Sequence, residues 1–490
     1  MAFQLSMIWS IGVRCLLISF VLVASSLGHA ADRPPNIVFV FADDLGINDL
    51  GCYGRRDQQT PHLDRLAAQG TRFTSAYCAQ PICSPSRAAV MTGKSPARLH
   101  LTTFLPGRPD CSSQKLLHPQ IRQQLPLEEQ TIAELLKPAG YVTACIGKWH
   151  LGGKGFGPKE QGFDVVHPGK ANTQPSETEG GKGEYDLTTV AERFITENKD
   201  RPFFLYLPHN NPHIPLAAKP ELVEKFKDSF NPLYAAVVAT LDDSVGRLMQ
   251  TLDQLDLTER TIFIFSSDNG GLHVLELKDN PATHNTPFRA GKGYVYEGGL
   301  RDPLIVRWPG KIPAGRIVDT PVVLTDLVPT WLDLCGVKSD IAFDGVSLAE
   351  LLKGGALPPR PLFWHFPHYT NQGSRPAGAV REGNWKLIEH YEDGRVELFD
   401  LSNDSGETSD LSAMEPSRAK DLREKLNTWR KSVGAQENSP NPNFDPAWHK
   451  KLYEDIDTSQ IPLKPTAAEM AKSFEVWRQG MDAVVSKARK

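Results

Sequence analysis

The chain has 490 residues, with 54 basic and 58 acidic side chains and a formal net charge of −4 at pH 7. This near balance excludes the strongly basic surface of a nucleic-acid-binding protein, so a site for an anion must carry its positive charge locally. With 40% apolar and 23% charged residues, the composition excludes a disordered chain, and the length allows a large domain and a smaller one.

The first 30 residues have the organisation of a signal peptide. Arg14 precedes an apolar run from Cys15 to Val23, and small residues end at Ala30. The run is too short to cross a bilayer core of about 30 Å comfortably, which favours cleavage over a membrane anchor. We expect a secreted or periplasmic protein with no stable membrane span. Cleavage would leave six of the seven cysteines, without the paired spacing of a zinc site.

Apolar runs bounded by polar residues predict strands that are buried on both faces of a sheet. These runs cover residues 37–41, 142–146, 203–207, 261–265 and 304–306. Residues 233–255 carry apolar side chains at helical spacing, which predicts an amphipathic helix. Strands that alternate with helices indicate an α/β fold with a large mixed, mostly parallel sheet flanked by helices.

Beyond residue 360 the pattern changes to short alternating strands. Residues 379–390 and 394–404 predict antiparallel strands, and residues 415–431 predict a charged helix packed on them. The expected organisation is therefore a large domain over residues 31–359, a smaller C-terminal antiparallel-sheet subdomain over residues 360–435, and an extended tail with a terminal helix over residues 436–490.

Acidic and amide side chains directly follow two of the predicted strands. Asp43 and Asp44 come after the first strand, and Asp268 and Asn269 come after the run at 261–265. Because ligands bind outside the carboxyl ends of strands in open α/β sheets, we expect these side chains to meet. Their oxygens suit a hard divalent cation, Ca²⁺ better than Mg²⁺, since Ca²⁺ accepts six to eight oxygens in flexible geometry. Either pair alone would more simply be a turn or a helix cap.

Cys83 lies in the segment CSPSR, where a helix is expected to begin. A thiol at a helix N-terminus, close to the Arg87 guanidinium, is expected to have a lowered pKa. A lone cysteine is more often a small buried hydrophobic residue, so the surrounding motifs must decide between the two interpretations.

The segments ADDLG, CSPSR, GKWHLG, PHIP, DNGG and GKG occur in this order along the chain. The ordered set resembles the type I sulfatases of the alkaline phosphatase superfamily, such as arylsulfatases and N-acetylgalactosamine-6-sulfatases, from about Asn36 to about Leu411. The resemblance implies an alkaline phosphatase-like fold, a catalytic domain at residues 31–359, and hydrolysis of sulfate monoesters of a carbohydrate. In this family a separate maturation enzyme oxidises the cysteine of CxPxR to formylglycine, whose hydrate carries two hydroxyl groups.

The resemblance also implies a role for each matching residue. The metal ligands would be Asp43, Asp44, the modified Cys83, Asp268 and Asn269. One hydroxyl of the modified residue would attack sulfur and the other would later expel the sulfate, so that two easier steps replace a difficult one.

The remaining catalytic residues would be Arg87, Lys148, His150, His213 and Lys292. Arg87 and Lys148 would orient and polarise the formylglycine. Lys292 would bind the sulfate. His213 and Lys292 would serve the leaving oxygen, with His213 the better acid, since a reference pKa of about 6.5 suits proton transfer near neutrality. His150 would take the proton of the second hydroxyl. Substrate contacts are expected from Lys148, His213 and Lys292.

Two alternative functions stay open. Relatives in the same superfamily hydrolyse phosphonates or phosphate diesters, and a chain with an unmodified Cys83 would be a non-catalytic carbohydrate-binding protein. The loop 102–111 is expected to shape the choice of sugar. The aromatic segment 364–369 is expected in the core, with a wall for a sugar as the alternative. His209 and His273 are expected to be structural, and Asn285 to support the site from behind.

Overall fold

The computed structural model describes residues 33–170, 174–276 and 281–489. The predicted signal peptide lies outside these residues. Within them, every helix is too short or too polar to cross a membrane.

An eight-stranded sheet with the order β10-β2-β9-β8-β1-β7-β5-β6 forms the centre of the molecule. Its inner strands contain the predicted apolar runs: β1 (Asn36–Ala42), β5 (Val142–Gly147), β7 (Phe203–Pro208) and β8 (Thr261–Ser267). These strands are mutually parallel, in the order β8-β1-β7-β5. All seven residues of β1 are buried, as expected for a strand covered on both faces.

The outer strands make the sheet mixed. β6 (Val165–Pro168) is parallel to β5, and β10 (Arg316–Val318) is parallel to β2 (Thr71–Phe73). Only β9 (Leu304–Arg307) runs the other way in this sheet, because it pairs antiparallel with both β8 and β2. The predicted fold class, a large mixed and mostly parallel sheet, is confirmed.

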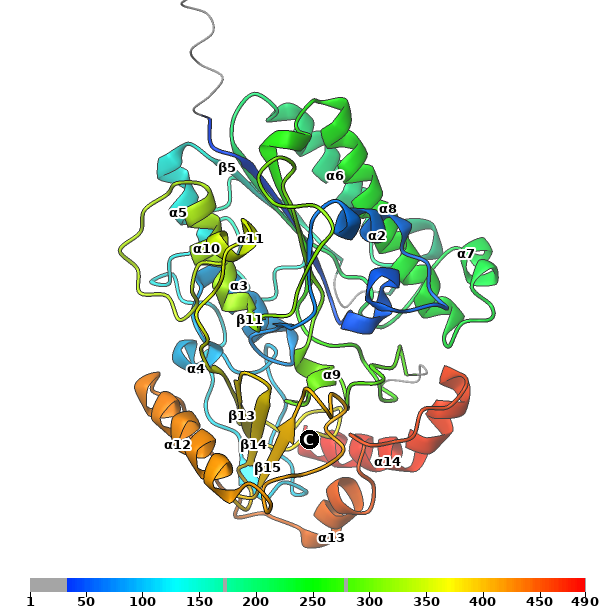
Figure 1. The fold of residues 1–490 in the computed structure, drawn as a ribbon. Coiled ribbons are helices and arrows are strands. Elements are labelled where there is room, and N and C mark those ends of the chain that lie inside the picture. Colours follow the sequence, from blue (N-terminus) through cyan, green and yellow to red (C-terminus); the bar gives the residue numbers. More distant parts are fainter. Residues whose placement is uncertain (1–32, 171–173, 277–280, 490) are drawn as a thin grey trace, which may run out of the picture.

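Two groups of helices cover the two faces of the sheet (Figure 1). Val38 and Val40 of β1 belong to the cluster that includes Leu241 of α8 (Pro232–Gln254). Phe39 and Phe41, which point to the other face, belong to the cluster that includes α3 (Cys83–Thr92) and α10 (Leu327–Leu334). Because successive side chains of β1 point to opposite faces, the strand contributes to the hydrophobic core on each side of the sheet. Further helices packed around the sheet are α2 (Pro61–Ala68), α5 (Ile132–Leu136) and α6 (Glu184–Glu197).

The C-terminal part contains a four-stranded antiparallel sheet in the order β12-β13-β14-β15. Its strands are β12 (Leu362–Phe366), β13 (Ala377–Glu382), β14 (Trp385–His390) and β15 (Val396–Asp400). The helix α12 (Pro416–Ser432) packs on this sheet through Leu422 and Leu426. In the segment after residue 436, α14 (Ala467–Ala488) buries Phe474 and Trp477 in the cluster that also contains residues of α8.

A buried charge network joins the small sheet to the segment between the GKG motif and β9. Lys386 of β14 is fully buried, and its ammonium lies 2.9 Å from Glu297 and 2.8 Å from Glu407. Glu297 begins the short helix α9 (Glu297–Leu300), which follows the predicted GKG segment. Because a buried charge is tolerated only with partners, this network fixes the small sheet against the elements that carry the candidate site.

The remaining elements are short. They are β3 (Ala76–Tyr77), β4 (Leu116–Leu117), β11 (Val322–Val323), β16 (Ser439–Pro440), α4 (Pro96–Leu99), α7 (Pro220–Lys225), α11 (Ala349–Leu352), α13 (Pro446–His449), η1 (Ile47–Asp49), η2 (Gly51–Tyr53), η3 (Lys137–Ala139), η4 (Glu177–Glu179), η5 (Thr258–Arg260), η6 (Leu324–Asp326) and η7 (Lys450–Glu454).

Candidate functional site

Strand register brings the predicted metal ligands together. Ala42 of β1 lies beside Ser267 of β8, so Asp43 and Asp268 leave the sheet side by side. Asp44 adopts φ 67°, a left-handed conformation that aspartate tolerates better than most residues, and its N–H donates to Asp268 Oδ1 at 3.1 Å. The tight turn after β1 therefore places the carboxylates of Asp43 and Asp44 at the same edge of the sheet as that of Asp268.

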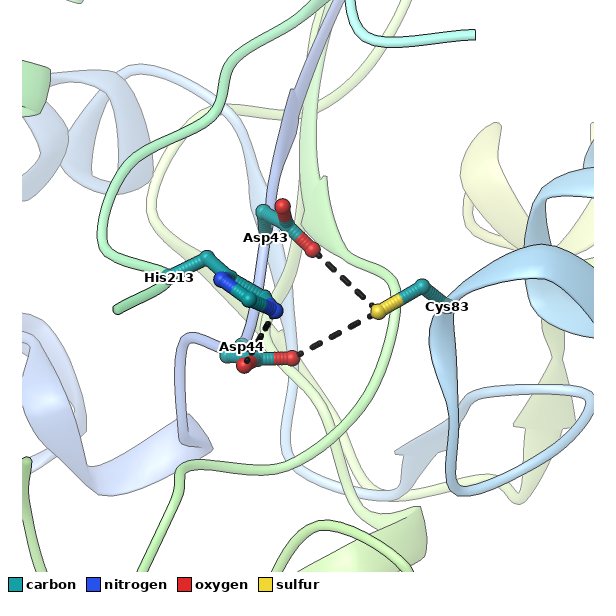
Figure 2. A group of neighbouring side chains, drawn as sticks. All are labelled: Asp43, Asp44, Cys83 and His213. Atoms are coloured by element: carbon teal, nitrogen blue, oxygen red, sulfur yellow. Dashed lines mark hydrogen bonds and ion pairs between the residues drawn. The ribbon is translucent and has the colours of Figure 1, made fainter. Parts of the chain in front are cut away.

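Cys83 faces these carboxylates from the first position of α3, as Figure 2 shows. Its Sγ lies 3.4 Å from Asp43 Oδ1 and 3.7 Å from Asp44 Oδ1. The expectation of a lowered thiol pKa is wrong. Burial raises the pKa of Cys83 well above its ordinary value, because the loss of water outweighs the attraction of the Lys148 ammonium. As a thiol, this side chain is therefore a poor nucleophile at neutral pH.

Arg87 lies one turn further along α3 and is completely buried. Its Nε and Nη2 donate to Asp268 Oδ2 at 2.9 and 2.7 Å, and its Nη1 donates to the carbonyl of Lys148 at 3.2 Å. Arg87 thereby ties the loops that follow β8 and β5 to the helix that begins at Cys83.

Two lysines pair with the two consecutive aspartates. Lys148 Nζ lies 2.5 Å from Asp43 Oδ2, and Lys292 Nζ lies 2.6 Å from Asp44 Oδ2. Burial alone would raise the pKa of Asp43, but Lys148 and its neighbours hold that pKa well below the usual range. For Lys292 the two effects are reversed. Burial alone would lower its pKa, but the Asp44 carboxylate holds that pKa well above the ordinary value. Both lysines are thus held in the charged form.

His213 lies on the other side of Asp44, with Nε2 3.6 Å from Asp44 Oδ2 (Figure 2). Its Nδ1 contacts the carbonyl of Ile214, which can only accept, so Nδ1 carries the hydrogen. Burial, reinforced by Lys292, lowers the pKa of His213 to about 3. The reference pKa on which the sequence argument relied therefore does not apply here, and the neutral ring turns the Nε2 lone pair toward the cluster.

His150 is also neutral. Its Nε2 lies 3.0 Å from the carbonyl of Leu105, and its buried Nδ1 has no hydrogen-bond partner among the described residues. Burial and the nearby Lys148 lower the pKa of His150 to about 3. With Nε2–H donating to the carbonyl, Nδ1 remains available to accept a proton.

A pocket of about 250 Å³ opens over this cluster. Its lining residues come from segments that are far apart in the sequence: Ile82, Cys83, Phe104, Leu105, Pro106, Lys148, His150, His213, Glu276, Lys292, Asn371 and Gln372. The loop 102–111, flagged in the sequence, supplies three of them. Glu276, Asn371 and Gln372 lie in no recognisable motif, and no sequence signal pointed to them.

Other flagged residues lie outside the pocket lining. His209 is enclosed by Glu184 and Ser244 in a fully buried hydrogen-bonded chain. His273 Nε2 lies 3.1 Å from the carbonyl of Thr458. Asn285 accepts from the N–H of Gly271 at 3.2 Å and donates to the carbonyl of Ala290 at 2.9 Å, so it joins the DNGG turn to the GKG segment.

The aromatic segment after residue 364 belongs to the interior. Trp364 and Phe366 are each 1% exposed and belong to the cluster on the α3 face of the sheet. Neither lines the pocket, so the core interpretation holds for Trp364 and Phe366.

The donor atoms at the strand ends suit a hard cation. Among the described residues, ligand atoms of Asp43, Asp44, Cys83 and His213 lie within 4.8 Å of one another. Asn269 Oδ1 is buried without a hydrogen-bond partner among these residues, while its Nδ2 donates to Asp44 Oδ1 at 2.9 Å. An unpaired buried amide oxygen beside carboxylates is costly unless a cation satisfies it.

The balance of charges among the buried side chains of the site also favours a bound cation. Three carboxylates, those of Asp43, Asp44 and Asp268, are matched by the three cations Arg87, Lys148 and Lys292. Asp268 differs from the other predicted ligands because Arg87 and the N–H of Asp44 already engage both of its oxygens. The protein groups alone therefore provide little net charge for an anion, and a divalent cation would provide it.

Comparisons with known proteins show the family of the chain. The family model described as "Sulfatase" matches residues 35–337, and the model "N-sulphoglucosamine sulphohydrolase, C-terminal" matches residues 290–432. The chain is 38% identical to N-acetylgalactosamine-6-sulfatase of Canis lupus familiaris over 72% of each chain. It is 36% identical to arylsulfatase A of Homo sapiens, over 74% of this chain and 76% of that protein.

Among solved structures, the one described as "Crystal structure of Ps i-CgsB" superposes with a TM-score of 0.70 and 30% identity. The match covers 81% of this chain and 93% of the other. The same protein in complex with k-i-k-neocarrahexaose gives a TM-score of 0.69 over the same shares of the two chains.

Proposed function

Because the chain belongs to the sulfatase family, whose members are sulfuric ester hydrolases, we propose that it cleaves sulfate monoesters of saccharides through a formylglycine made from Cys83. The observation that carries this proposal is the convergence of Cys83, two lysines and two neutral histidines in one pocket above Asp43 and Asp44. The saccharide is supported by the names of two similar proteins, an N-acetylgalactosamine-6-sulfatase and a structure that holds k-i-k-neocarrahexaose.

The groups around Cys83 have distinct tasks in this proposal. The hydrate of the formylglycine supplies one hydroxyl that attacks sulfur as the ester S–O bond breaks, and a second that expels sulfate as the aldehyde re-forms. Lys292 and Lys148, both charged, attract the sulfate oxygens. Arg87 keeps the helix N-terminus in place behind the reacting residue.

Lys292 and His150 move the protons, and His213 orients the groups between which they move. Lys292 is protonated at neutral pH and can donate to the leaving oxygen. His213 stays neutral and presents its Nε2 lone pair on the same side, where it accepts a hydrogen bond and orients the groups at the leaving oxygen. His150, whose Nδ1 is free to accept, takes the proton of the second hydroxyl.

A divalent cation, Ca²⁺ before Mg²⁺, would be held by Asp43, Asp44, Asp268 and Asn269, together with the modified Cys83. When bound it would offset negative charge on the transferred group and lower the pKa of the attacking hydroxyl.

We also propose that the protein is exported from the cytoplasm. The predicted signal peptide at residues 1–30 would carry the chain to a secreted or periplasmic location, and a formylglycine-generating maturation enzyme would act on Cys83 as a transient partner. We assign the catalytic domain to residues 31–359, and the regions 360–435 and 436–490 to a subdomain and tail that brace it.

A panel of aryl sulfate, phosphate diester and phosphonate ester substrates tests the reaction class. We expect kcat/KM for the sulfate to exceed the values for both phosphorus esters. The reason is charge: the lysines and one cation suffice for a singly charged sulfate, whereas phosphate monoesterases commonly recruit a second metal. Phosphonate or phosphate diester turnover that exceeds sulfate turnover by orders of magnitude would replace the proposal with its superfamily alternative.

Lys182 is a positioning residue for His213. It is 2% exposed, and its ammonium donates to the carbonyls of His213 at 2.6 Å and Ile214 at 3.1 Å. The Ile214 carbonyl is also the acceptor of His213 Nδ1. Replacing Lys182 with methionine is expected to lower kcat about 10- to 100-fold with little change in KM, because the ring loses its fixed orientation.

Steady-state kinetics on an aryl sulfate measure this effect. Lys182→Arg should recover most of the rate, whereas Lys353→Met, at an exposed lysine just after α11, should leave both constants unchanged. Equal losses in Lys182→Met and Lys182→Arg, accompanied by a lower melting temperature, would show that Lys182 only stabilises the fold.

A further inference from the structure

Glu276 is the one acidic side chain among the residues that line the pocket. A carboxylate is an unexpected neighbour for a site that binds an anion, and none of the catalytic steps uses it. It is partly buried, and one of its oxygens is held by the side chain of Gln372, whose Nε2 donates to Glu276 Oε2 at 2.5 Å. No hydrogen bond from the described residues reaches its other oxygen, Oε1.

Gln372 is itself fixed in place. It is 3% exposed, and its carbonyl accepts hydrogen bonds from the Tyr294 hydroxyl at 3.1 Å and the Thr458 hydroxyl at 3.4 Å. Its own Oε1 is buried without a partner among the described residues. A buried amide oxygen without a partner, such as Oε1 of Gln372, lowers the stability of the fold, while Nε2 of the same side chain orients Glu276.

This pair lies next to the sulfate-binding lysine. A Cβ atom at Gly293, the neighbour of Lys292, would lie 3.0 Å from Gln372 Oε1, so the glutamine packs directly on the GKG segment. Glu276 and Lys292 line the same pocket. Against the lowering effect of burial, the charge of Glu276 also raises the pKa of Lys292, though less than the charges of Asp44 and Cys83. Glu276 is therefore close enough to meet the group that carries the sulfate.

We propose that Glu276, positioned by Gln372, selects the sugar: it accepts a hydrogen bond from a hydroxyl or amide N–H beside the sulfate ester and rejects a carboxylate or second sulfate there. The inference rests on the proposed function and narrows its substrate class. A carboxylate is an acceptor only, so it favours donors and repels like charge. The predicted substrates are sulfates of neutral hexoses or N-acetylhexosamines, and uronic acid sulfates are excluded.

Matched substrate pairs test this selection. Each pair consists of a methyl hexopyranoside sulfated at O2, O3 or O4 and the uronate sulfated at the same oxygen, because a uronate has no O6 hydroxyl. Hexose 6-sulfates and p-nitrophenyl sulfate serve as substrates without a matched uronate. For the matured wild type we expect kcat/KM to favour the neutral member of the best pair by about 100-fold or more, because like charges in an interface are strongly disfavoured.

Two variants locate the cause. Glu276→Gln keeps the shape and removes the charge, so the neutral-to-uronate ratio should fall by at least about tenfold. Gln372→Ala releases Glu276 and should reduce the same ratio by a smaller factor, a change that a purely structural role of Gln372 would not produce. Glu350→Gln, at an exposed glutamate of α11, should match the wild type.

The outcomes separate the inference from the proposed function. If sulfates are hydrolysed but the wild type accepts uronates equally, or if Glu276→Gln leaves the ratio unchanged, the selection by Glu276 is wrong and the sulfatase mechanism stands. If matured wild type hydrolyses neither p-nitrophenyl sulfate nor any sugar sulfate, the proposed function fails and the inference fails with it.

Discussion

Replacing Cys83 with alanine is expected to lower sulfate ester hydrolysis by about 10⁴-fold or more, the scale on which loss of a nucleophile acts in other hydrolases. Cys83 lies at the start of α3 and faces Asp43 and Asp44, and no other described residue of the pocket could become an aldehyde. The remaining lysines and histidines would still bind the sulfate. Product release over time, measured on an aryl sulfate, gives the loss in rate.

Cys83→Ser makes the prediction sharper. A serine has one hydroxyl, so it can attack sulfur but cannot expel the sulfate by re-forming an aldehyde. We expect at most one product molecule per protein molecule, and a sulfated peptide that mass spectrometry detects. Cys335→Ser, at a buried cysteine of the α10 end, serves as the control and should keep full turnover. Sustained turnover by Cys83→Ala would contradict the assignment of Cys83 as the nucleophile precursor.

Removal of the divalent cation has the second largest expected effect. After dialysis against a chelator we expect activity to fall by about 10²-fold or more, because the carboxylates and basic groups of the site then cancel and the sulfate loses its main electrophilic partner. Added Ca²⁺ should restore the activity better than Mg²⁺. The melting temperature should also rise with Ca²⁺, since a ligand at about 100 times its Kd stabilises the folded state by about 2.7 kcal/mol.

Thermal shifts with Ca²⁺ report on the site without any need for turnover. Asp44→Asn should abolish most of the shift, because Asp44 faces both Cys83 and Asn269. Asp421→Asn, at an exposed aspartate of α12, should retain it. A full calcium shift in Asp44→Asn, or full activity in the chelated protein, would rule out a cation at these strand ends.

The inner sheet could be predicted from the sequence because its signal is local. The run at residues 37–41 lies within β1 (Asn36–Ala42), and the predicted helix 233–255 corresponds to α8 (Pro232–Gln254). Strand direction could not be predicted in the same way. Residues 304–306 form β9, whose antiparallel pairing with β8 depends on how the chain returns through the GKG segment, and no periodicity encodes that path.

In the site, too, the features with a local sequence signal could be predicted and those set by tertiary structure could not. Cys83, Lys148, His150, His213 and Lys292 lie in short motifs and meet in the pocket. Their electrostatics were outside the reach of sequence, because burial sets them: it raises the pKa of Cys83 and lowers that of His213, against both expectations.

Part of the pocket wall, the loop 102–111, was expected from the sequence, but Glu276, Asn371 and Gln372 could not be predicted. Glu276 and Gln372 are 96 residues apart, and the carbonyl of neighbouring Asn371 is held by Arg478 of the terminal helix. Only tertiary structure joins such segments, so the residues proposed to choose the sugar carry no motif.

The central claim is that Cys83 acts as an aldehyde, and one measurement tests it most directly. Protein is prepared with graded amounts of the maturation enzyme, and mass spectrometry of the peptide that contains Cys83 gives the fraction of thiol replaced by aldehyde in each preparation. If the aldehyde is the active form, kcat on an aryl sulfate rises in proportion to this fraction and extrapolates to zero when all of Cys83 remains a thiol. Full activity in a preparation whose Cys83 is entirely thiol would contradict it.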